Sequence, residues 1–140
     1  MRYVLDTSVL VAAIRSNVGA SNGLVEAALS KKFILIGTTN LFFEYEAVLT
    51  RPEHLAASGL SAKRVRELLD ALALVVMEIH PAYLWRAQLR DPDDDMVLEA
   101  AINGRADAIV TFNLRDFGAV PSRFGIRVLL PGEALKGLLQ

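Results

Sequence analysis

The sequence predicts an α/β domain in which a central parallel β-sheet is covered by helices on both faces. Short apolar segments alternate with amphipathic helical segments along the whole chain, as in repeated strand–helix–strand units. Hydrophobic residues make up 53% of the sequence and the mean hydropathy is +0.35, values that suit a sheet buried on both faces. With 140 residues, we expect a single domain over residues 1–140.

The composition excludes several classes of protein. The absence of cysteine rules out disulfides and cysteine-ligated zinc sites. The longest apolar run, Ala71–Met77, is far shorter than the roughly 18 residues of a membrane helix, and the N-terminus is too short and too acidic for a signal peptide. We therefore expect a cytoplasmic protein without membrane association. The net charge of −1 gives no general attraction to nucleic acid, so any binding of RNA must come from local charges or bound metal.

The first elements are predicted from the N-terminal 30 residues. Tyr3–Leu5 is a short apolar strand, and Val9–Ile14 is the helix that follows it. Ser16–Gly23 has the composition of a flexible loop, and the helical pattern resumes over Leu24–Leu29. Asp6 lies between the first strand and the first helix, where it either caps the helix or belongs to a functional site.

The next strand and helix hold two acids that the pattern does not distinguish. Phe33–Ile36 is the second strand, and a Thr-Thr-Asn segment caps a helix that runs through Leu49 to an Arg-Pro stop. Glu44 and Glu46 flank the apolar face of this helix on opposite sides. Helical geometry alone leaves open which of them faces a site.

The middle of the chain is predicted as loop, helix, strand and helix. His54 lies in a loop, and Leu60–Leu74 is a helix with apolar residues at helical spacing. Val75–Ile79 is predicted as a short strand. Another helix is expected to begin at Pro81, with Trp85 in the core.

The last 50 residues complete the alternation. The predicted elements are a turn at Asp91-Pro92, a helix over Asp93–Asn103 ended by Gly104, a buried strand over Ala108–Thr111, a turn over Asn113–Phe117, a strand over Phe124–Leu130 and a closing helix from Pro131.

Acids cluster where the predicted topology brings strand ends together. Asp6 directly follows the first strand, Asp116 follows the strand over Ala108–Thr111, and the run at residues 91–95 holds four acids in five positions. Ligands bind beyond the carboxyl ends of the strands in open parallel sheets, and right-handed crossovers place these groups on one edge. Such oxygen ligands suit Mg²⁺ or Mn²⁺. Without metal, at least one of the clustered carboxyls should have a raised pKa.

The acidic run offers three neighbouring candidates. Successive helical side chains point about 100° apart, so at most two of Asp93, Asp94 and Asp95 face a shared site. We favour Asp95, because it shares a face with Leu98 and Glu99, and we assign Asp93 or Asp94 to capping. Taken alone, the run is better explained as a well-capped acidic helix start.

The chain resembles the PIN domain, the metal-dependent ribonuclease fold of VapC-type toxins. The resemblance rests on an apolar strand leading into Asp6-Thr7-Ser8, on the EYEAVL segment from Glu44 followed by Arg-Pro, on the DPDDD run ending at Asp95, and on VTFNLRDF, which contains Asp116. The motifs most resemble the subgroup described as toxin components of toxin–antitoxin systems. A three-layer PIN-like fold is therefore expected.

The resemblance implies a function and a set of residues. It implies a metal-dependent endoribonuclease that hydrolyses RNA, the toxin of a type II toxin–antitoxin pair, working as a homodimer with a cognate antitoxin protein as partner. It selects Glu44 over Glu46. The implied residues are Asp6, Glu44, Asp95 and Asp116 as catalytic ligands of Mg²⁺ or Mn²⁺, supported by Ser8, Thr111 and Asn113. The subgroup often has an acid where Asn113 stands, which weakens a second metal position.

Two other functions are weighed against this one. An aspartyl phosphatase or phosphotransfer domain would use Asp6 as its nucleophile, but such proteins want a second acid two residues later, and that position is Ser8. A non-catalytic domain that only binds a partner would not need four acids.

Overall fold

The computed structural model describes residues 1–80, 89 and 91–139. Its centre is a parallel five-stranded sheet with the strand order β3-β2-β1-β4-β5. The strands are β1 (Arg2–Leu5), β2 (Ile34–Gly37), β3 (Met77–Glu78), β4 (Ala108–Val110) and β5 (Arg127–Leu129). The predicted fold class, a three-layer α/β arrangement, is confirmed.

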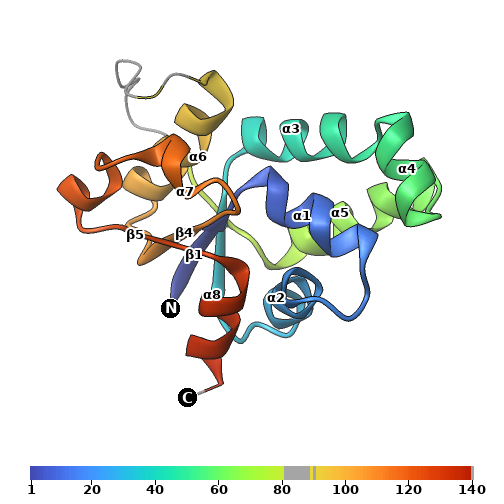
Figure 1. Ribbon diagram of the computed structural model, residues 1–140, viewed down its shortest axis with the longest axis horizontal. Helices are drawn as coiled ribbons and strands as arrows, with labels where there is room; N and C mark the ends of the chain where they lie inside the picture. Colours follow the sequence, from blue (N-terminus) through green and yellow to red (C-terminus); the bar gives the residue numbers. More distant parts are fainter. Residues whose placement is uncertain (81–88, 90, 140) are drawn as a thin grey trace.

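Helices cover both faces of the sheet (Figure 1). One layer is formed by α1 (Thr7–Arg15), α2 (Ala20–Leu29), α5 (Ala62–Val75) and α8 (Pro131–Leu138), with α2 in contact with the other three. On the other face, α6 (Pro92–Asn103) packs across β1, β4 and β2. The remaining helices are α3 (Thr39–Leu49), which touches both α1 and α6, α4 (Pro52–Ser58), α7 (Leu114–Phe117) and the 3-10 helix η1 (Pro121–Phe124). Among the described residues, no helix combines the length and apolar character needed to cross a membrane.

The strand order places a topological switch point between β1 and β4. The chain moves outward from β1 through β2 to β3, and then returns to the other side of β1 for β4 and β5. Leu5 is paired with Val110, and the backbone N–H of Asp6 donates to the Val110 carbonyl at 2.9 Å. The residues that follow these two strands therefore start side by side at the carboxyl edge, which is where open α/β sheets bind ligands.

The two central strands form the middle of the core. Val4 and Leu5 of β1 and all three residues of β4 have no exposed surface. This continuous apolar character is expected of parallel strands buried on both faces. Burial of each Val, Leu or Ile side chain contributes roughly 1.5–3 kcal/mol to folding stability relative to an exposed one. The strands that flank the switch point are therefore held by a large apolar core.

The second helix begins earlier than predicted. The residues Ala20–Gly23, expected as part of a loop, form the first turn of α2. A Cβ on Gly23 would lie 2.8 Å from Cδ2 of Leu135 in α8. The glycine is therefore present because two helices approach closely, and this tertiary packing overrides its low helix propensity.

Two other boundaries differ from the prediction, and one predicted element is not tested. His54 lies in α4, not in a loop, because Pro52 starts that helix at its first position, where its missing N–H is not needed. The expected strand over Phe124–Leu130 is confined to β5, because Gly125 has φ +72° and ends the preceding 3-10 turn. The helix expected from Pro81, with Trp85 in the core, lies outside the described residues.

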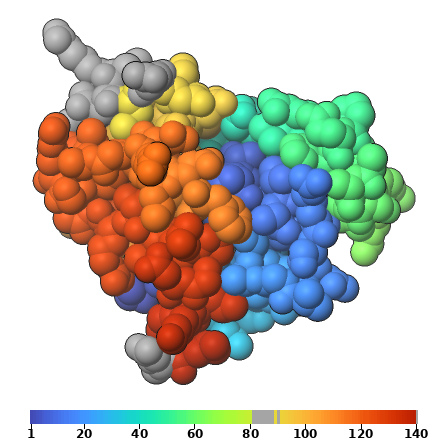
Figure 2. Space-filling model, viewed as in Figure 1, coloured from blue at the N-terminus to red at the C-terminus, as the bar shows by residue number. Residues whose placement is uncertain are grey.

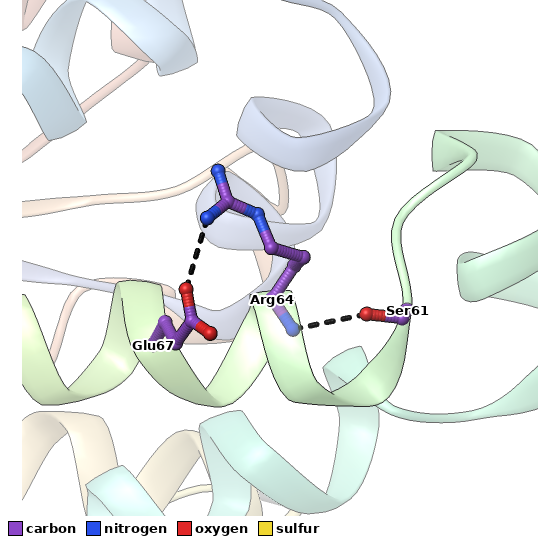
Figure 3. A network of polar contacts seen from close by, with 3 residues as sticks. All are labelled: Ser61, Arg64 and Glu67. Atoms are coloured by element: carbon purple, nitrogen blue, oxygen red, sulfur yellow. Dashed lines mark hydrogen bonds and ion pairs between the residues drawn. The ribbon is translucent and has the colours of Figure 1, made fainter.

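The start of α5 is capped by Ser61 (Figure 3). The hydroxyl of Ser61 accepts a hydrogen bond from the backbone N–H of Arg64 at 3.2 Å. Arg64 then forms an ion pair with Glu67 one turn later, at 2.9 Å. Both charged side chains are largely exposed, so this pair adds little stability, and the charges of α5 lie on a solvated face.

Candidate metal centre

Asp6 lies at the end of β1 with its carboxylate fixed by two hydroxyls. Its side chain is 7% exposed, and Oδ2 accepts hydrogen bonds from Oγ of Ser8 at 2.8 Å and from Oγ1 of Thr111 at 2.7 Å. Asp6 occupies the N-cap position of α1 but makes no side-chain capping bond. Within the described residues, Oδ1 has no hydrogen-bond partner, so one carboxylate oxygen is oriented and the other can bind a ligand.

The hydroxyls that hold Asp6 connect β1 to the segment after β4. Thr111 is fully buried, and its Oγ1 also accepts the backbone N–H of Asn113 at 2.9 Å. Oγ of Ser8 accepts the backbone N–H of Phe112 at 3.4 Å. Ser8, Thr111 and the backbone of Asn113 are thus brought together around Asp6, and they fix the turn that leads to Asp116.

Tyr45 is a positioning residue that the sequence analysis treated only as part of an apolar face. It is 1% exposed, and its hydroxyl donates to the carbonyl of Leu5, the residue before Asp6. Burial, and secondarily the charge of Asp6, raise the pKa of Tyr45 above its usual range, so the hydroxyl keeps its proton as a donor. This contact holds α3 against the end of β1.

The acidic run begins α6 one residue earlier than predicted. Asp91 is the N-cap, and its Oδ1 accepts the backbone N–H of Asp93 at 2.9 Å. Pro92 occupies the first helical position. The capping role that we assigned to Asp93 or Asp94 therefore belongs to Asp91.

Asp94 is the member of the run that faces the other acids. It is 8% exposed, and its pKa is raised to about 6, first by burial and then by the negative charges of Asp6, Asp91, Asp116 and Asp93. Its carboxyl group makes no hydrogen bond or ion pair with other parts of the described chain. The expectation that one clustered carboxyl has a raised pKa is confirmed here.

Asp95, which the sequence analysis favoured, points to a different environment. Its Oδ1 accepts the backbone N–H of Leu89 at 3.0 Å. The structure places Asp94 within electrostatic range of both Asp6 and Asp116, a position that the sequence analysis expected for Asp95. The reason is the phase of α6: Asp94 shares the buried stripe with Val97, Leu98 and Ala101, a spacing of three and four residues visible in the sequence.

Glu44 lies at the edge of the acid cluster, and Glu46 does not. Burial raises the pKa of the half-buried Glu44, and the adjacent Asp93, within hydrogen-bonding reach, raises it further, while Arg51 lowers it. Glu46 instead pairs with Arg66 of α5 at 3.2 Å. Structure and resemblance thus agree on which of the two glutamates stands beside the acidic start of α6.

Asp116 is exposed on α7, within electrostatic range of Asp94. Arg15 is the basic residue in the last turn of α1, and Asp6 is at the opposite end of that helix. The helix therefore separates Arg15 from Asp6 by about 13 Å along its axis, at 1.5 Å per residue. Arg51 is the cation that the sequence analysis did not connect with the site. It is the N-cap of α4, its side chain is exposed, and it lies within electrostatic range of Glu44.

The donor chemistry of this edge fits a divalent cation. The acids offer only hard oxygen ligands, as Mg²⁺ and Mn²⁺ prefer, and Asp6 Oδ1 and the Asp94 carboxyl lack partners among the described residues. In the conformation seen, however, no three acidic, histidine or cysteine side chains in the described part of the chain stand close enough to enclose an ion. The acids are neighbours within electrostatic range of one another, not a closed cage.

A comparison with family models decides the identity of the fold. Residues 2–115 match the model of the PIN domain, which is most of the chain. The chain belongs to the PIN domain family. PIN domains are generally nucleases that bind divalent metals and act on RNA. The acids at the carboxyl edge of the sheet are the kind of residues that such a nuclease would need to bind a metal. Searches of curated proteins and of solved structures gave no match. The matched region ends directly before Asp116, whose place near the cluster is given by the structure.

Proposed function

We propose that this PIN domain is a metal-dependent endoribonuclease, the VapC-like toxin of a type II toxin–antitoxin pair. The observation that carries the proposal is that Asp94 lies within electrostatic range both of Asp116 and of the hydroxyl-held carboxylate of Asp6 at the switch point of the sheet. Hydrolysis of a phosphodiester needs a nucleophile and a way to stabilise the negative charge that develops on oxygen. An all-carboxylate site meets both needs through a bound cation.

The residues would divide this work among themselves. Asp6 Oδ1, Asp94 and Asp116 would hold Mg²⁺ or Mn²⁺ once their side chains rotate toward one another, and Glu44 would bind a second ion or orient the attacking water. Bound there, a divalent cation supplies a nucleophile from water near neutral pH and attracts the phosphate. Ser8 and Thr111 keep the Asp6 carboxylate in one orientation, and Arg51 would contact the RNA backbone beside Glu44.

An aspartyl phosphatase is the competing enzyme class. In that reading Asp6 would be phosphorylated, and the second acid two residues later would assist. The residue at that position is Ser8, and its hydroxyl donates to Asp6, so it supplies no acid–base group. A phosphorylated enzyme trapped at Asp6 would restore this alternative.

The proposal is tested by titrating the metal-free protein with Mn²⁺ in a calorimeter. We expect saturable binding by the wild type and at least about tenfold weaker binding by Asp6→Asn, since even groups outside the ligand shell commonly cost 10–100-fold. Asp70→Asn is the matched control, because Asp70 is exposed on α5 and loses the same charge. Cleavage of single-stranded RNA should require Mn²⁺ or Mg²⁺ and stop in EDTA. Equal Mn²⁺ affinity in all three proteins would refute the metal centre.

We also propose that the protein is a homodimer. Phe43 of α3 is 65% exposed and Leu74 of α5 is 87% exposed, on helices that contact each other. Phe43 lines a hollow of about 190 Å³ together with Ala73, so this surface offers an apolar face for a second chain.

Light scattering at micromolar concentration should give twice the 15.3 kDa mass of one chain. Leu74→Arg should shift the mass toward one chain. Val18→Arg is the control, since Val18 is 90% exposed in the loop before α2 and should leave the mass unchanged. A wild type of 15.3 kDa contradicts the dimer.

The antitoxin is proposed from the resemblance alone. A small open reading frame directly upstream, whose product co-purifies with this chain and suppresses RNA cleavage, is the expected finding.

A further inference from the structure

A hollow of about 480 Å³ is lined in part by Phe112, the residue that follows Thr111, the hydrogen-bond partner of Asp6. It is lined by Phe112 after β4, by Ala12 and Ala20 at the α1–α2 junction, and by Leu130 and Gly132 at the start of α8. These three segments meet on the face shown in Figure 2, where they are coloured orange, blue and red. Its volume is in the range of small-ligand sites.

The backbone of Phe112 is connected to Asp6 by the hydrogen bonds already described. Its backbone N–H donates to Oγ of Ser8 at 3.4 Å, and the same oxygen donates to Asp6 Oδ2 at 2.8 Å. Phe112 also stands between Thr111, which bonds to Asp6, and Asn113. A phosphate at the acids would therefore bring the adjacent nucleotide to this hollow.

The lining of the hollow suits a flat apolar ligand. Phe112 is 49% exposed, and the residues around it are mainly small, so the ring is accessible. A single exposed aromatic side chain is common on proteins and means little alone. Here it coincides with a hollow and with a catalytic edge. Asn113, the next residue, has an exposed side chain that makes no capping bond.

We propose that this hollow binds one unpaired nucleobase of the RNA, stacked on Phe112, next to the phosphate that the acids attack. The proposal rests on the ribonuclease function proposed above and adds a specificity site to it. Proteins recognise single-stranded RNA by stacking unpaired bases on aromatic side chains and by hydrogen bonds to base edges. The base in this hollow would then determine the sequence preference of cleavage.

The test is equilibrium binding of a short single-stranded RNA with nonhydrolysable linkages in Mn²⁺. Phe112→Ala should weaken binding by about 5- to 150-fold, the range that corresponds to 1–3 kcal/mol for one stacked base. Phe112→Trp should retain the affinity, and Phe112→Leu, apolar but unable to stack, should lose it. A series of RNAs with one abasic position should contain one member for which wild type and Phe112→Ala bind equally.

A second variant fills the hollow without removing the ring. A Cβ on Gly132 would meet no atom within 4 Å, so Gly132→Leu should fold normally and block the base. It should lower the affinity, whereas Gly132→Ala should change it little. Melting temperatures near that of the wild type show that these exposed positions leave the fold intact.

The possible results distinguish a failure of the base-binding proposal from a failure of the ribonuclease proposal. If wild type cleaves RNA but Phe112→Ala and Gly132→Leu bind and cleave as well as wild type, the base site is wrong and the ribonuclease stands. If Phe112 governs binding but no RNA is cleaved, the base site stands and the ribonuclease fails. Wild-type affinity in Phe112→Leu, or a loss that persists with every abasic RNA, overturns stacking. A wild type that does not bind the RNA overturns the base site, whatever its Mn²⁺ affinity.

Discussion

The Asp94→Asn variant is expected to cleave RNA more than about 100-fold more slowly than wild type in Mn²⁺. Asp94 is the buried carboxyl that faces both Asp6 and Asp116, so its oxygen would bind the ion directly. Loss even of groups that only support a ligand commonly costs 10–100-fold in activity or metal affinity, and loss of a ligand should cost more. The measurement is kcat/KM on single-stranded RNA, with the melting temperature recorded to show that the variant is folded.

Asp95→Asn is the matched control for this prediction. The substitution removes the same charge one residue away, and the asparagine oxygen can still accept the backbone N–H of Leu89 that Asp95 Oδ1 accepts at 3.0 Å. Activity within a few-fold of wild type is expected. If Asp95→Asn is the inactive variant and Asp94→Asn is active, the choice made from the sequence was right and the structural placement of the ligand is wrong.

The alternation of strands and helices was enough to predict the fold, because burial on both faces requires continuous apolar strands. The same topology brought Asp6 and the segment holding Asp116 to one edge, since parallel strands share their carboxyl ends. These are long-range consequences of a simple pattern. They do not depend on where any helix begins or ends, and boundary errors such as that at Ala20 left them unchanged.

The choice between neighbouring acids needed information that the local pattern did not hold. Glu46 is excluded by its pairing with Arg66, twenty residues away on another helix. Asp94 and Asp95 both lie one turn from Leu98. Only the whole buried face of α6, which also includes Val97 and Ala101, shows that Asp94 is the buried acid of the two. The spacing to Leu98 and Glu99 alone favours the adjacent position, Asp95.

The hollow beside Phe112 was beyond sequence reasoning for a different reason. It is formed by three segments that are distant in the chain, and its space exists because Gly132 and two alanines carry small side chains. No spacing rule connects these positions. The role of Tyr45 was missed similarly, because its hydroxyl meets a backbone carbonyl forty residues away.

The second large effect concerns stability without metal. The folded-state pKa of Asp94 is about 6, against 3.8 for an ordinary aspartate. Because the folded pKa is raised, this group's contribution to stability is complete below about pH 3.8 and is lost as the pH rises through about 6. The shift of about two pKa units corresponds to at most roughly 3 kcal/mol at pH 8, and solvent around the edge of this carboxyl group screens its charge and lowers that figure. The charged form of Asp94 also interacts favourably with the helix dipole in the first turn of α6, but this interaction offsets only about 0.3–1 kcal/mol of the destabilisation.

Asp94→Asn should therefore melt several degrees higher than wild type at pH 8 in EDTA, and at nearly the same temperature at pH 4. Mn²⁺ should narrow or reverse this difference in melting temperature. An ion that binds only the folded state adds about 2.7 kcal/mol to stability at a hundredfold excess over Kd, and the variant, which lacks the Asp94 carboxylate, should bind Mn²⁺ more weakly and gain less. Thermal melting of both proteins at the two pH values, with EDTA and at pH 8 with Mn²⁺, measures each step. A variant that is less stable than wild type in EDTA at pH 8, yet gains as much from Mn²⁺, would show that Asp94 is a structural residue of α6 and would remove it from the metal centre.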